Sequence, residues 1–108
     1  MVDQDRVSAL QELLKGNPND AFARYALGLE YSGSGDSQAA LREFNLLLAA
    51  HPDYTNGYFM AAQVLDRDGQ LTEARHMLLK GIDSARKTNN RHALSEMEAM
   101  LEDVQTRE

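Results

Sequence analysis

Segment 31–40 reads YSGSGDSQAA and holds the residue types from which phosphate-binding loops are built. Glycine lets the backbone come close to a ligand, and the start of a helix attracts an anion. A phosphate loop also needs a strand before it and a Gly-Lys-Ser/Thr sequence at its end. Here the preceding residues are helix formers and no lysine follows. We therefore do not expect a nucleotide site in this segment.

The remaining candidates for chemistry are three histidines and one acidic run. His51, His76 and His92 are far apart in the sequence, and Lys80 rather than a ligand stands four residues after His76. Segment 66–73, DRDGQLTE, resembles a calcium loop, but its glycine comes too early and the acids do not continue. No serine stands near a base motif. We expect no catalytic residue, no metal site and no cofactor, and hence a protein that is not an enzyme.

Composition narrows the possible partners of the chain. Its 108 residues suit one domain, and cysteine is absent, which excludes disulfides and thiolate metal sites. Seventeen acidic and eleven basic residues leave a net charge of −6, which disfavours binding to nucleic acid or to an anionic membrane. No segment has the roughly 20 apolar residues that a membrane span needs. The opening MVDQDRVSAL has no apolar run typical of a signal peptide, so we expect a cytoplasmic protein.

The elements that position these residues are predicted to be helices. Alanine, leucine, methionine, glutamate, glutamine and arginine are frequent, and no run alternates with period two. Prolines and glycines interrupt the chain about every 15 residues. We predict helices near 3–15, 20–32, 37–50, 55–67, 71–86 and 90–105. The predicted capping residues are Asn19 or Asp20, Asp36 or Ser37, Thr55 and Thr72.

Two parts of the chain repeat each other. YSGSGDSQAALREF, residues 31–44, aligns without gaps on LDRDGQLTEARHML, residues 65–78. Gly35 falls on Gly69 with an offset of 34 (69 − 35), and Pro18 and Pro52 have the same offset (52 − 18 = 34). A fixed period of this length with two helices in each period is typical of a helical solenoid. The preserved Gly35 is therefore expected to be the turn between paired helices.

The repeat resembles the tetratricopeptide repeat family. The first copy matches its pattern at Leu27, Gly28, Tyr31, Ala40, Phe44 and Pro52. The second, looser copy matches at Tyr58, Ala61, Ala62, Leu65, Gly69, Ala74 and Leu78. The first copy departs at Arg24, where the family usually has a large residue, and the second has Arg86 in place of the closing proline. The chain is similar to small stand-alone bacterial proteins of this family, which implies a scaffold or adaptor role.

The resemblance implies an all-α fold, a short right-handed α-α superhelix of about six antiparallel helices. We expect a single domain, 1–108, with an N-terminal capping helix or half repeat in 1–20, repeats in 21–54 and 55–88, and a capping helix in 89–108. The apolar stripes of the two flanks support this layout. They comprise Val7, Leu10, Leu13 and Leu14 at the start, and Leu94, Met97, Leu101 and Val104 at the end.

In this family the first helix of each repeat lines a concave groove that binds a partner. Carried over to this sequence, the groove positions are Phe22, Tyr25, Leu29 and Ser32 in the first repeat, and Asn56, Phe59, Gln63 and Asp66 in the second. The expected binding residues are Phe22, Tyr25, Leu29, Asn56, Phe59 and Gln63. The partner expected from the apolar members is a peptide or a protein helix with apolar anchors.

Two alternatives to this partner-binding groove stay open, and one ligand class is disfavoured. Phe22, Tyr25 and Phe59 could instead complete the core or contact the terminal helices. The groove or the last helix could also make a homodimer. One family subtype captures an acidic C-terminal tail with a Lys and Asn clamp, but Tyr25 and Leu29 occupy the corresponding positions of the first repeat. We therefore do not expect that ligand.

Overall fold

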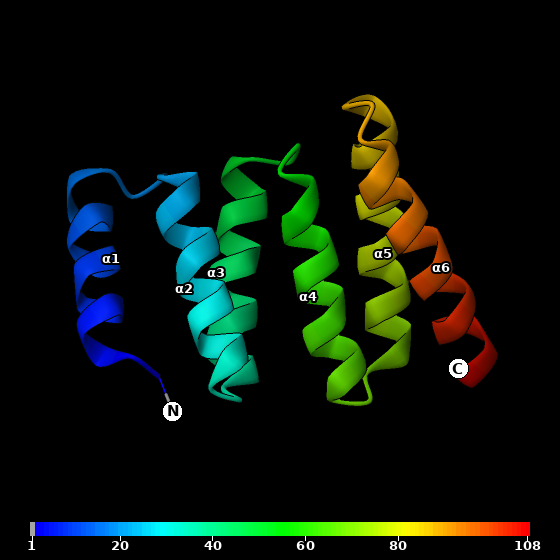
Figure 1. The fold of residues 1–108 in the computed structure, drawn as a ribbon, viewed down its shortest axis with the longest axis horizontal. Coiled ribbons are helices and arrows are strands. Elements are labelled where there is room, and N and C mark those ends of the chain that lie inside the picture. Colours follow the sequence, from blue (N-terminus) through cyan, green and yellow to red (C-terminus); the bar gives the residue numbers. More distant parts are fainter. Residues whose placement is uncertain (1) are drawn as a thin grey trace. The chain divides into compact units, whose positions relative to one another are not determined.

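The fold was determined as a computed structural model, which describes residues 2–108. Within them lie six α-helices and no strand, and helices that follow one another within each half run in opposite directions (Figure 1). The helices are α1 (Gln4–Gly16), α2 (Ala21–Gly33), α3 (Ser37–Ala50), α4 (Thr55–Arg67), α5 (Leu71–Lys87) and α6 (Arg91–Arg107). The predicted all-α class is confirmed, and each predicted helix is observed within two residues of its expected ends.

Two of the four predicted helix caps are confirmed. The carboxylates of Asp20 and Asp36 accept hydrogen bonds from the amides three residues later, at 3.0 and 3.1 Å. The predictions for Thr55 and Thr72 are wrong. Thr55 is the first residue inside α4, where its hydroxyl lies 2.8 Å from that of Ser84. Thr72 lies one residue inside α5, and its hydroxyl donates to Glu108 instead.

The turns between paired helices use a left-handed residue. Gly35 and Gly69 have φ values of 85° and 76°, as expected from their repeat. The amide after each glycine donates to the carbonyl five residues before it, Asp36 to Tyr31 and Gln70 to Leu65, which closes the helix end. The turn between α5 and α6 has the same arrangement around Asn89, with φ 55°. Asparagine is the non-glycine residue that best tolerates this conformation.

The chain divides into two compact units, Met1–His51 and Pro52–Glu108. The prediction of one domain stays a prediction. In the first unit, α1 packs against α2, and α2 against α3. Small residues of α2 allow close approach of the helices. The apolar core between α1 and α2 comprises Val7, Leu10, Leu14, Ala23, Ala26 and Leu27, with Val2 and Tyr31 at its edge.

The second unit packs α5 between α4 and α6. Its core is built around the fully buried side chains of Val64, Leu78, Met97 and Val104. Gly81 of α5 lies directly against Tyr58 of α4 and Met97 of α6, with no room for a methyl group. The helices predicted near 71–86 and 90–105 are both observed. The longer α5 gives α6 a full helix length against which to pack.

Candidate functional site

The face of α2 predicted to bind a partner carries two exposed apolar side chains. Phe22 is 63% exposed and Leu29 is 39% exposed, although both are large and apolar. They are seven residues apart, so two helical turns place them on the same side of α2. Phe22 is therefore not part of the core.

Tyr25 lies between these two residues on the same face but has a second role. Its ring is tilted by 52° against the ring of Phe44 of α3, with centroids 6.2 Å apart. The side chain is half-buried. Aromatic pairs in this geometry are stabilising. Tyr25 therefore supports the packing of α2 on α3 as well as contributing to the exposed face.

The corresponding face of α4 is more polar. Asn56 and Gln63 are exposed, and Phe59 between them is half-buried. Asp66, at the end of this face, is held by Arg107 of α6, with Oδ1 and Nη1 2.8 Å apart. The six predicted binding residues thus lie on two helices, three in each unit, and their role in binding stays a prediction.

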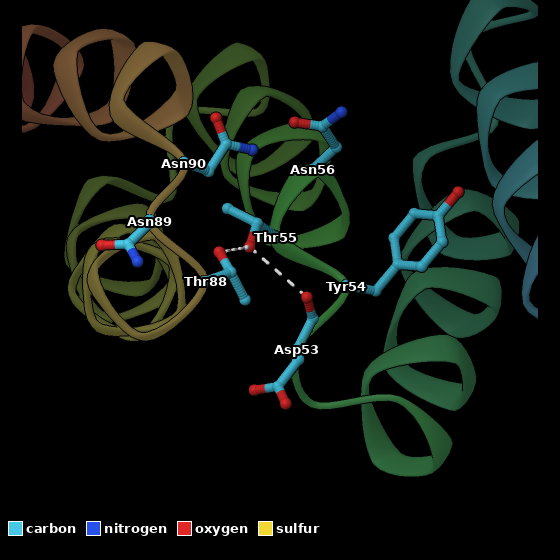
Figure 2. Close-up of a pocket in the computed structure, with 7 residues that line it drawn as sticks. All are labelled: Asp53, Tyr54, Thr55, Asn56, Thr88, Asn89 and Asn90. Atoms are coloured by element: carbon cyan, nitrogen blue, oxygen red, sulfur yellow. Dashed lines mark hydrogen bonds between the residues drawn. The ribbon is translucent and has the colours of Figure 1, made fainter.

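A hollow of about 530 Å³ opens beside the start of α4. Figure 2 shows that its walls come from two short segments, the residues that lead into α4 and the turn between α5 and α6. Sequence reasoning identified only Asn56 as a binding residue here. The lining residues are Asp53, Tyr54, Thr55, Asn56, Thr88, Asn89 and Asn90.

Hydroxyl groups form the floor of this hollow. Thr55 and Ser84 are buried and share a hydrogen bond of 2.8 Å, and the Thr88 hydroxyl donates to the Ser84 carbonyl at 2.9 Å. The Asn90 carboxamide oxygen caps α6 by accepting from Ala93. Tyrosine is neutral at pH 7, and burial raises the pKa of Tyr54 above its ordinary value. The hollow is thus lined by neutral hydrogen-bonding groups and one carboxylate, that of Asp53.

Cation ligands are not gathered anywhere in the described part of the chain. No group of three or more histidine, cysteine, aspartate or glutamate side chains within residues 2–108 could hold a metal ion. His51 ends the first unit, with its Nε2 2.6 Å from the Asn19 carbonyl. His92 is exposed and lies 3.1 Å from Glu96. Both histidines therefore have local structural partners.

None of the helices within residues 2–108 is both long enough and apolar enough to cross a membrane.

Comparison with known proteins links the chain to helical repeat proteins. No protein-family model matches it. A TPR repeat-containing protein from Pseudomonas aeruginosa is 24% identical over 95 residues, which is 88% of this chain and 90% of that protein. The solution structure of a tetratricopeptide repeat domain protein from Salinibacter ruber is 28% identical with a TM-score of 0.79. That match covers 85% of this chain and 93% of the Salinibacter chain.

Two further solved structures are similar in fold. The type III secretion translocator chaperone SycD of Yersinia enterocolitica is 20% identical with a TM-score of 0.88, over 96% of this chain and 72% of its own. The TPR2B domain of yeast Sti1, solved in a complex with pHsp70, is 17% identical with a TM-score of 0.87. The match covers 94% of this chain and 82% of that domain.

Proposed function

Because this chain is a small protein of the tetratricopeptide repeat type, as its sequence predicted, we propose that it binds a protein or peptide partner through the first helix of each repeat. The observation that carries the proposal is the exposure of Phe22 on α2, at 63%. Neighbouring exposed apolar side chains mark interaction surfaces, and aromatic anchors contribute strongly to protein interfaces. Leu29 extends the same apolar stripe by two turns.

The face of α4 would supply the polar part of recognition. The exposed side chains of Asn56 and Gln63 each carry one acceptor and two donor hydrogens. Such groups can pair with the main-chain amides of a bound segment, which gives orientation without requiring a charge. Two proteins of similar fold, the translocator chaperone SycD and the TPR2B domain in its pHsp70 complex, are analogies for such a role at the level of fold.

The test is a pull-down from the native cell extract with the double variant Phe22→Ala/Leu29→Ala. The matched control is Leu46→Ala on α3, which removes an apolar side chain of similar exposure, 45%. We expect bound proteins to disappear with the double variant and to remain with the control. Equal loss in both variants, or retention in both, would show that the α2 face is not the binding surface. Circular dichroism should show unchanged helicity in all variants.

Self-association is the second candidate function. Leu79 of α5 is exposed, and with Ile82 and Leu101 it forms the apolar part of a groove between α5 and α6. The other residues that line this groove are Arg86, Glu98, Glu102 and Gln105. A second copy could cover this groove. Light scattering at two concentrations separates the candidates, because a mass that stays at 12.1 kDa at high concentration excludes the dimer.

A further inference from the structure

The end of α6 reaches back to the turn between α4 and α5. The Arg107 guanidinium bridges Asp66 of α4, with Nη1 and Oδ1 2.8 Å apart, and Asp103 of its own helix, at 2.7 Å. The Glu108 carboxylate accepts from Thr72 at 2.9 Å and from Arg75 at 2.8 Å. Two consecutive residues thus contact both helices that flank the turn.

These charges complement the ends of the helices that they contact. Asp66 stands one residue before the end of α4, where the helix dipole disfavours a negative charge, and Arg107 neutralises it. Glu108 meets the first turn of α5, where a negative charge is favoured. Gln70, the N-cap of α5, makes no side-chain capping bond. The carboxylate from α6 holds the start of α5 through the side chains of Thr72 and Arg75.

Polar contacts alone hold this last turn. Val104 is the final buried residue of α6, and every residue after it is exposed. Lifting the last turn would therefore break the ion pairs without uncovering core. Asp103 lies four residues before Arg107 on the same helix, and the two stay paired only while this turn is helical.

We propose that Arg107 and Glu108 form a latch that closes the last turn of α6 onto the α4–α5 turn and opens as a unit. In the closed state Arg107 covers Asp66, and Glu108 binds the side chains of Thr72 and Arg75 at the start of α5. In the open state the Asp66 carboxylate is accessible on α4, and the first turn of α5 frays. The latch does not depend on the proposed partner-binding function.

Hydrogen exchange followed by mass spectrometry tests the latch in the whole chain. The variant is Arg107→Gln/Glu108→Gln, and the matched control is Arg86→Gln/Glu98→Gln. The control pair also joins α5 to α6, but it is exposed and 3.7 Å long. We expect amides in 71–75 and 102–108 to exchange about tenfold faster in the latch variant and no faster in the control. Amides in 4–50 should not change in either variant.

Salt supplies a second measurement that needs no substitution. Raising ionic strength to about 1 M screens exposed ion pairs. It should accelerate exchange at 71–75 and 102–108 in the unaltered protein but add little in the latch variant. Unchanged exchange in the latch variant would overturn the proposal, as would equal acceleration in the control pair or a salt effect spread over all helices. If the latch variant fails to fold, the salt measurement on the unaltered protein still decides.

Discussion

Arg24 of α2 and Glu43 of α3 form an ion pair, with Nη1 and Oε1 2.8 Å apart, where the second repeat has an uncharged pair. Their side chains are 20% and 9% exposed. The positions 34 residues later hold Tyr58 (58 − 24) and Met77 (77 − 43). The Tyr58 hydroxyl donates to the Pro52 carbonyl at 2.8 Å and forms no ion pair. The departure from the repeat pattern at Arg24 is therefore compensated by a matching acid on α3.

We predict that Glu43→Ala destabilises the protein by about 3 kcal/mol, because it leaves Arg24 partly buried without its partner. Urea denaturation measures the change. Arg42→Ala, which removes an exposed side chain 3.9 Å from the same carboxylate, should cost less than about 0.5 kcal/mol. The double variant Arg24→Tyr/Glu43→Met introduces the pair of the second repeat and should restore most of the loss. A Glu43→Ala variant as stable as the Arg42→Ala control would contradict the assignment.

Gly28 of α2 lies directly against Phe44 of α3. A methyl group at Gly28 would overlap the ring of Phe44. We predict that Gly28→Ala destabilises by about 1–3 kcal/mol through overpacking, despite the better helix propensity of alanine. The second repeat has Ala62 and Leu78 at the equivalent positions (62 − 28 = 34; 78 − 44 = 34). Gly28→Ala/Phe44→Leu should therefore be more stable than Gly28→Ala alone. Thermal melting compares the two variants, and a lower melting temperature for the double variant would contradict overpacking at this contact.

Gly33 and Gly35 are predicted to respond oppositely to the same substitution. Neither has an atom within 4 Å of the position that a Cβ would take, so packing does not decide the outcome. Gly35 has φ 85°, and Gly35→Ala should cost about 1–2 kcal/mol. Gly33 ends α2 in ordinary helical geometry, and Gly33→Ala should stabilise by up to about 1 kcal/mol. Chemical denaturation of both variants checks the signs, and two changes of equal sign would be incompatible with this account.

The ion pair of Glu108 should make stability depend on pH. Hydrogen bonds from Arg75 and then Thr72 hold the pKa of Glu108 below its ordinary 4.5, with smaller contributions from the charges of Arg75 and His76. Because the folded pKa is depressed, the stabilisation is fully present above pH 4.5 and is lost as the pH falls through the folded value. Arg107 stays charged throughout, since hydrogen bonds to Asp66 and Asp103 raise its pKa further.

We therefore expect Glu108→Gln to lower the melting temperature at pH 7 and to lower it less at pH 3. Glu12→Gln is a suitable control, because that exposed carboxylate pairs only with Lys15 three residues away. Scanning calorimetry at both pH values measures the two differences. A Glu108→Gln effect that is the same at pH 3 and pH 7 would exclude the contribution of this ion pair.

Much of the fold could be predicted because its signals are local. The bounds of α3 and α4 coincide with the predicted ranges, since Asp36, Gly35 and Pro52 mark the ends by their own conformational preferences. The two wrong caps have one cause. Thr55 and Thr72 have the right residue type for a cap, but their hydroxyls are taken by Ser84 and Glu108, which are 29 and 36 residues away.

The sequence by itself determined the six helices, their turns and the 34-residue repeat, because helix propensity, capping and glycine conformation act within a few residues. Only the tertiary structure decided how side chains are shared between helices. It placed Tyr25 against Phe44 while leaving Phe22 exposed, paired Arg24 with Glu43, and brought Arg107 to Asp66. These contacts depend on the distance and rotation of one helix relative to another, which residue spacing along a single helix does not specify.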